Sequence, residues 1–292
     1  MICRLCPRNC GALRTATEGA GWCRMPEGPV VARAALHMWE EPPISGTRGS
    51  GTIFFSGCSL GCVFCQNEKI SHRDFGRPIT IERLADICHE LIAQGAHNLN
   101  FVNPTHYAHV VAQLLTEHPM PVPTVWNSGG YDRVETLRAL EGTVDIYLPD
   151  YKYPDARDAQ CWAGAADYPQ VARAAIQEMV RQTGPYVLDQ EGILQRGVVI
   201  RHLLLPGRLN QAKEVMDWVR ATFPPHTVLF SLMSQYIPWG RAAEFPPLDR
   251  RLRKREARAA MAYLENLSLD GFFQGEEAAR AEYIPAFDLT GV

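Results

Sequence analysis

The feature that most constrains this chain is the stretch 57–67, GCSLGCVFCQN. Cys58, Cys62 and Cys65 lie within eight residues there, directly after a short apolar run. Soft thiolates crowded on a loop that contains glycine suit an iron–sulfur cluster or another thiolate metal site. An ordinary cubane cluster takes four protein thiolates, and since only three are close together here, one iron would be left for a ligand from outside the protein. A buried cysteine stripe on a helix has the same spacing, but the glycines and the polar residues that end the stretch disfavour a helix.

A second group of cysteines opens the chain, at Cys3, Cys6, Cys10 and Cys23, with proline and glycine between them. Four thiolates would complete the coordination of a structural zinc ion, or of an auxiliary iron–sulfur cluster used for electron transfer or rigidity. Reduced cysteines that bind no metal are the alternative. Because four protein ligands would leave no position for a substrate, we expect a structural site, and the sequence does not choose between zinc and iron.

Composition places the chain among ordinary globular proteins, with 46% hydrophobic and 21% charged residues and a formal net charge of −3. That charge gives no reason to expect nonspecific binding to nucleic acid. No apolar stretch approaches the ~18 residues of a membrane span, and no basic-then-apolar segment opens the chain. We therefore expect a cytoplasmic protein, in which seven of nine cysteines gathered before residue 66 favour metal binding over disulfides.

From residue 52 onward, short β-rich runs alternate with helical periodicity, a pattern typical of βα units around a parallel sheet. We predict an α/β fold, a partial (β/α)6 TIM-like barrel, with a cysteine-rich segment 1–48, the barrel at 49–240, and a C-terminal helix and tail at 241–292. Thr80 and Asn210 are the expected caps of two of the helices. The expected strands are 53–55, 98–102, 122–126, 144–148, 197–205 and 227–232, with a hairpin turn at 189–192.

Ligands of such barrels bind where the parallel strands end, so the segments that follow the strands are the candidate site. By contrast, Glu40 and Glu41 stand before the rigid pair Pro42-Pro43. A position near the active site is one interpretation, but adjacent acids beside prolines favour a solvated turn, so we assign them no acid–base role. Besides the three-cysteine loop, the segments at strand ends are 103–106, 127–130, 150–152, 206–207 and 234–236.

The three-cysteine spacing, with Phe64 before the third cysteine, resembles the signature of the radical S-adenosylmethionine (SAM) superfamily. The resemblance implies that Cys58, Cys62 and Cys65 hold a catalytic [4Fe-4S] cluster whose fourth iron is chelated by SAM. Reductive cleavage would then give methionine and a 5′-deoxyadenosyl radical that abstracts a hydrogen atom. In such enzymes the cofactors perform the hard step, and the protein supplies position and water exclusion.

Within that superfamily, residues 50–238 resemble the activases of glycyl radical enzymes, of the pyruvate formate-lyase activating type. Asp150-Tyr151-Lys152 resembles their Asp-x-Lys motif, in which the lysine meets the SAM carboxylate. Their Gly-Gly-Glu acid, which receives the SAM amino group, is replaced here by Asn103-Pro104-Thr105, where the Thr105 hydroxyl and backbone carbonyls could accept those protons. The expected cofactor-binding residues are Phe64, Asn103, Thr105, Asn127, Ser128, Asp150, Lys152 and Arg201.

The resemblance also implies partners, namely a reductase or flavodoxin-like electron donor and a glycyl radical enzyme. However, the replaced acid and the cysteine-rich N-terminus resemble a subgroup whose substrate is open, so a small molecule, a peptide or RNA is the alternative substrate. A zinc-stabilised binding protein without turnover is the alternative from another class. The sequence does not indicate the oligomeric state.

Overall fold

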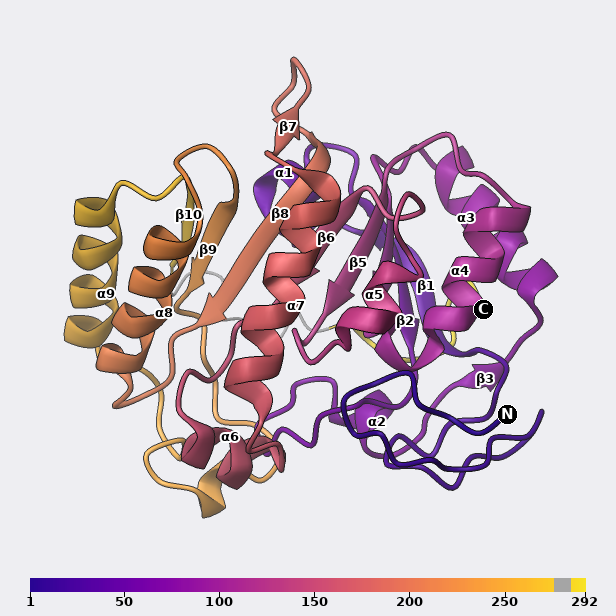
Figure 1. Ribbon diagram of the computed structural model, residues 1–292, viewed down its shortest axis with the longest axis horizontal. Helices are drawn as coiled ribbons and strands as arrows, with labels where there is room; N and C mark the ends of the chain where they lie inside the picture. Colours follow the sequence, from indigo (N-terminus) through magenta and orange to yellow (C-terminus); the bar gives the residue numbers. More distant parts are fainter. Residues whose placement is uncertain (276–284) are drawn as a thin grey trace.

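The protein is described by a computed structural model that covers residues 1–275 and 285–292 (Figure 1). In this part of the chain one open ten-stranded sheet has the order β10-β9-β8-β6-β5-β4-β2-β1-β3, and β7 pairs with β8. The partial α/β barrel is confirmed, with one parallel strand more than expected. The parallel strands are β2 (Ser50–Phe55), β4 (Leu99–Val102), β5 (Thr124–Ser128), β6 (Ile146–Pro149), β8 (Leu194–Leu203), β9 (Leu229–Met233) and β10 (Gly271–Gln274).

The additional parallel strand is β10, which the sequence analysis assigned to the C-terminal tail. It pairs with β9, and Gly271 makes the close approach possible, because a Cβ there would lie 1.9 Å from the Phe230 carbonyl oxygen. The last residues return to the other end of the sheet, where the Phe287 ring packs edge-on against Phe54 at 5.4 Å. These residues thus cover an edge of the sheet, whereas Tyr283, within the same tail 241–292, lies outside the described residues.

Residues 30–46 add two elements that the sequence pattern did not indicate. β1 (Val30–His37) pairs antiparallel with β2 on one side. On its other side, β1 pairs antiparallel with β3 (Arg77–Pro78). The short helix α1 (Pro42–Ser45) then lies behind the sheet, at the end where the parallel strands begin (Figure 1). There Ile44 packs into an apolar cluster of Val125, Ile146, Leu148, Leu194, Val199 and Leu229.

Strand alternation gives the sheet two different faces. On β5, Trp126 belongs to the large cluster under the helices, whereas Val125 belongs to the cluster around Ile44, on what we call the inner face. The helices α3 (Ile81–Ala93), α4 (Ala108–Glu117), α5 (Val134–Arg138) and α7 (Tyr168–Thr183) lie on the opposite face (Figure 1). The other helices after α1 are α2 (Glu68–Ser71), α6 (Ala156–Ala163), α8 (Leu209–Thr222) and α9 (Lys254–Leu267), with 3-10 turns η1 (Thr105–Tyr107) and η2 (Ala242–Glu244).

The local predictions can be compared with these boundaries. The Thr80 side chain caps α3 by accepting a hydrogen bond of 3.2 Å from the Arg83 backbone N–H, as expected. The Asn210 cap is wrong, because α8 already begins at Leu209. The predicted hairpin is confirmed as the antiparallel pair of β7 (Val187–Leu188) with β8. Among the described helices, none combines the length and apolarity needed to cross a bilayer.

The N-terminal residues 1–29 lie against the end of the sheet where the parallel strands finish (Figure 1). Two arginines fasten them there. Arg14, 1% exposed, donates hydrogen bonds to the backbone carbonyls of Pro26, at 3.0 Å, and His106, at 2.5 Å. Arg8 stacks on Trp22 and donates to the Ser59 carbonyl at 2.8 Å, within the three-cysteine loop. The N-terminal segment is thereby placed next to the three-cysteine loop.

Candidate functional site

A cavity of about 230 Å³ lies where the parallel strands end. It is lined by the three-cysteine loop, by residues at the ends of β4, β5, β6 and β8, and by Tyr236 after β9, which is where the strand-end rule places a ligand. The predicted segment 206–207 does not line it. Thr105 is the predicted cofactor-binding residue that does not line it. The predicted site residues that do are Cys58, Cys62, Phe64, Cys65, Asn103, Asn127, Ser128, Asp150, Lys152 and Arg201.

Each sulfur of the three-cysteine loop has a polar contact, and those of Cys58 and Cys62 accept a hydrogen bond. The Leu60 backbone N–H donates to Cys58 Sγ at 3.3 Å, and the Tyr153 hydroxyl donates to Cys62 Sγ at 3.5 Å. The Cys65 Sγ lies 3.2 Å from the Ser71 hydroxyl. Such contacts stabilise negative charge on sulfur, which is the form that binds iron.

The loop thiols are also desolvated and close to one another. Burial raises the pKa of the Cys58 thiol, and the neighbouring Cys65 and Cys62 raise it further. Burial likewise raises the pKa of Cys65 to about 11, again with Cys62 adding to the effect. The thiols are therefore protonated in the metal-free protein, and metal binding there would release their protons.

The N-terminal cysteines gather in the same manner. Cys3, Cys6 and Cys23 are buried, and Cys10 is exposed. Burial raises the pKa of Cys6 to about 12, with smaller contributions from the thiols of Cys23, Cys3 and Cys10. Within residues 1–275 and 285–292, no three His, Cys, Asp or Glu side chains are close enough to hold a single metal ion. The sulfur atoms of thiolates that bind one zinc ion lie about 4 Å apart, since a Zn–S bond is about 2.3 Å long. The sulfur atoms of thiolates that bind separate irons of a cubane cluster lie farther apart.

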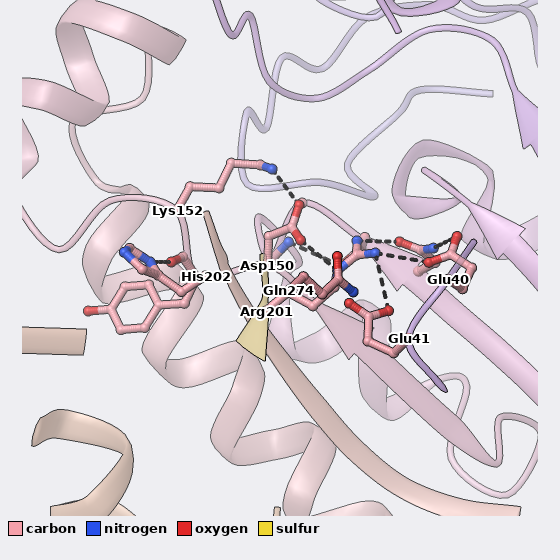
Figure 2. A network of polar contacts seen from close by, with 12 residues as sticks. Glu40, Glu41, Asp150, Lys152, Arg201, His202 and Gln274 are labelled. Atoms are coloured by element: carbon pink, nitrogen blue, oxygen red, sulfur yellow. Dashed lines mark hydrogen bonds and ion pairs between the residues drawn. The ribbon is translucent and has the colours of Figure 1, made fainter. Parts of the chain in front are cut away.

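Arg201 is the centre of a buried polar network beside the cavity (Figure 2). Its Nε donates to Asp150 at 2.8 Å, its Nη2 to the Asn127 amide oxygen at 2.7 Å, and its Nη1 to Glu40 at 3.2 Å. Lys152 in turn donates to the other carboxylate oxygen of Asp150. Burial alone would raise the pKa of Asp150, but Arg201 and Lys152 outweigh it and hold that pKa below its usual value.

The solvated turn expected at Glu40 and Glu41 is wrong. The Glu41 residue is 1% exposed, and its carboxylate lies 3.9 Å from Arg201, on the inner face of the sheet. The Glu40 carboxylate also accepts hydrogen bonds from the side-chain amides of Asn100, at 3.3 Å, and Asn127, at 3.1 Å. Two prolines after a pair of acids favour a turn, but this turn faces the interior because α1 closes that end of the inner face. The partners come from β4, β5 and β8, which no local pattern reveals.

Asp132 is a second buried acid with an unexpected position. An acid followed by Glu135 three residues later is a pattern typical of a helix start, but α5 begins at Val134, and Asp132 is 2% exposed. Its carboxylate accepts hydrogen bonds from the hydroxyls of Thr105, at 2.7 Å, and Ser128. The Thr105 hydroxyl is thus directed away from the cavity, although it was expected to receive the SAM amino group.

Comparisons with known proteins agree with this arrangement. Residues 45–151 match the family described as Fer4_12, a 4Fe-4S single cluster domain. The solved structure of Streptococcus suis SuiB bound to S-adenosylmethionine covers 75% of this chain with a TM-score of 0.50 and 13% identity. SuiB bound to the precursor peptide SuiA covers 75% with a TM-score of 0.51 and 13% identity. The chain spans about half of SuiB, 48% and 47% of the two chains, and at this identity the likeness shows the fold.

A relative at higher identity covers nearly the whole chain. The uncharacterized protein MJ0674 of Methanocaldococcus jannaschii is 30% identical over 277 residues, which are 92% of this chain and 75% of that protein. The aligned length includes more than the three-cysteine loop and its neighbourhood. The chain therefore belongs to the same family as MJ0674, and its fold is the partial barrel of the radical SAM enzymes.

Proposed function

We propose that the protein is a radical SAM enzyme, with a [4Fe-4S] cluster on Cys58, Cys62 and Cys65 and SAM in the adjoining cavity. The observation that carries this proposal is that the three thiols and the ionic group of Asp150 and Lys152 line one cavity. When bound, the cluster supplies the electron for cleavage of SAM to methionine and a 5′-deoxyadenosyl radical, which abstracts a hydrogen atom.

The cavity offers a matching group for each part of SAM. Lys152, which donates to Asp150, is the cation for the SAM carboxylate. The amides of Asn103 and Asn127 line the cavity as donors and acceptors for polar atoms. Phe64 and Tyr236, whose rings meet edge to face at 5.6 Å, supply an apolar wall for the adenine.

A second cavity, of about 350 Å³, reaches the same cysteine loop from the side of the N-terminal residues. It shares Cys58, Cys62 and Cys65 with the first cavity, and Trp22 and His72 line its other walls. We propose this cavity as the entry for a substrate segment of a polypeptide, such as the glycine loop of a glycyl radical enzyme. A modified peptide is the second candidate, because SuiB, which shares the fold, was solved with a precursor peptide.

The proposal extends to the electron supply and the chain segments. A flavodoxin-like reductase would deliver the electron, and Cys3, Cys6, Cys10 and Cys23 would hold zinc or an auxiliary cluster. The segments 1–48, 49–240 and 241–292 remain our proposed division of the chain. Metal analysis separates this enzyme from a binding protein, because zinc without iron, sulfide or a ~400 nm chromophore after anaerobic preparation would indicate the latter.

The direct test is anaerobic reconstitution with iron and sulfide, followed by incubation with dithionite and SAM. We expect 5′-deoxyadenosine from the wild type and from Cys161→Ala, which removes an exposed thiol on α6. We expect none from Cys58→Ala. Equal product from the wild type and Cys58→Ala would refute the proposal. A glycyl radical signal on a candidate partner enzyme, or a mass change on a peptide, small molecule or RNA, then assigns the substrate.

A further inference from the structure

The inner face of the barrel holds more negative than positive charge around Arg201. Three carboxylates, those of Glu40, Glu41 and Asp150, lie in the same network as the two cations Arg201 and Lys152. All five side chains are at most 22% exposed. With every group ionised, the network therefore has one buried negative charge without a counter-charge, which is costly unless a proton or a cation neutralises it.

Glu41 is the group at which this excess is least compensated. Its Oε2 is buried and has no hydrogen-bond partner within the described residues. Arg201 is 3.9 Å away and already donates at shorter distances to Glu40 and Asp150. Burial, the largest effect, raises the pKa of Glu41, and the neighbouring Glu40 and Asp150 carboxylates raise it further against the opposing effect of Arg201.

The position of the two acids is fixed by the backbone of their own segment. The Ser45 hydroxyl accepts a hydrogen bond of 2.9 Å from the Glu40 backbone N–H, and it donates at 3.2 Å to the His37 carbonyl. The Glu41 carbonyl accepts from the backbone N–H groups of Ile44 and Ser45 at 2.8 and 3.0 Å. The acids are thus held in place by a turn anchored in the apolar cluster around Ile44.

Resting on the proposed function, we propose that Glu40 and Glu41 supply the negative charge that selects the cationic cofactor SAM, in place of an acid after β4. SAM has a carboxylate, an ammonium and a sulfonium, and therefore a net charge of +1, which matches the excess charge of the network. Neither glutamate lines the cavity, so both are positioning residues that act through Arg201 and Asn127, which do. The segment 103–105, which follows β4, offers no carboxylate for this purpose.

S-Adenosylhomocysteine provides the matched ligand for a test, because it lacks the methyl group and with it the sulfonium charge. The measurement is the ratio of the dissociation constants of S-adenosylhomocysteine and SAM, by anaerobic equilibrium dialysis with reconstituted protein at about pH 8, well above the ordinary pKa of a glutamate. In Glu41→Gln we expect this ratio to fall about tenfold, the effect of losing one partly screened charge. Glu41→Asp should keep most of the ratio, and Glu141→Gln, an exposed acid paired with Arg181, should keep all of it.

The ratio separates a charge effect from structural damage, because a loosened cavity weakens the binding of both ligands together. An unchanged ratio in Glu41→Gln and Glu40→Gln would overturn the inference while leaving the proposed function intact. A ratio that falls equally in Glu141→Gln would overturn it as well, since the effect would then come from overall charge. If the reconstituted wild type bound neither ligand, the proposed function itself would fail, and the inference with it.

Discussion

The substitution Arg201→Met tests how the buried network is held together. Arg201 donates hydrogen bonds to Asp150, Asn127 and Glu40, and its side chain is 14% exposed. Methionine has a similar length and no charge, so it would leave three buried carboxylates with Lys152 as the nearest cation. Removing one partner of a buried ionic group costs about 3–5 kcal/mol, because the remaining charge stays desolvated.

For a chain of this size we expect the midpoint temperature to fall by roughly 6–20 °C, at about 2–4 °C per kcal/mol. The assay is thermal unfolding of the reconstituted protein under anaerobic conditions at one heating rate. Arg241→Met is the matched control, because Arg241 is 63% exposed and its partner Glu244 is 57% exposed. The exposed ion pair of this control should contribute at most about 1 kcal/mol to the free energy of unfolding.

The stability lost in Arg201→Met should also depend on pH. Burial raises the pKa of Glu40 and Glu41 above the unfolded value even though Arg201 lowers it. Removing the Arg201 charge would therefore raise the pKa of both glutamates further. A carboxyl whose folded pKa exceeds its unfolded pKa binds a proton on folding, so its contribution to stability increases as the pH falls. The deficit of Arg201→Met relative to wild type should therefore shrink between about pH 8 and pH 6. A deficit below about 1 kcal/mol, or one that is constant over this range, would refute the reasoning.

Three further predictions follow from contacts around the site. Arg8→Lys keeps the charge but loses the planar contacts with Ser59, Ala163 and Trp22, so chelators should bleach the cluster absorbance several-fold faster; a rate within about twofold of wild type would contradict this. Arg14→Met leaves the carbonyls of Met25, Pro26 and His106 without their donor, and hydrogen exchange should accelerate in residues 1–29 but not in α7. Asp132→Asn replaces one acceptor of the Thr105 and Ser128 hydroxyls by a donor, which should cost about 1–3 kcal/mol in thermal unfolding; an unchanged midpoint would show that these hydrogen bonds do not matter.

Much of the candidate site could be predicted because it follows from local patterns. Parallel strands separated by helices bring the ends of β4, β5 and β6 to one edge, so Asn127 and Asp150 were expected together although they are far apart in sequence. Arg201 was expected there from the family resemblance. The clustering of Cys58, Cys62 and Cys65 followed from their spacing alone. In both cases a few neighbouring residues contain all the information that the prediction needs.

The missed features depend on contacts between distant segments. Asp132 resembles a helix start in sequence, and only its hydrogen bonds to Thr105 and Trp126 across strand ends reveal its place. β10 is short and follows a helix, so no alternation was long enough to indicate a strand. Glu40 and Glu41 were judged by their own neighbours, although α1 and three strands decide their environment. Burial of a charged residue is a property of what packs against it, and a local pattern contains little of that information.

The inner face explains why this chain tolerates charge so deep in its barrel. On four neighbouring strands, an apolar inner residue near Ile44 is followed two positions later by a polar one, so that water is excluded on one side of the network and admitted to the cavity on the other. Low polarity beneath the network strengthens its ion pairs and raises the cost of any unpaired charge. Strand register fixes the position of Arg201, whereas a preceding turn fixes Glu40 and Glu41, so these two acids of the network are placed independently of the strand ends. The residue pairs are Val125 with Asn127, Leu148 with Asp150, Val199 with Arg201, and Leu229 with Ser231.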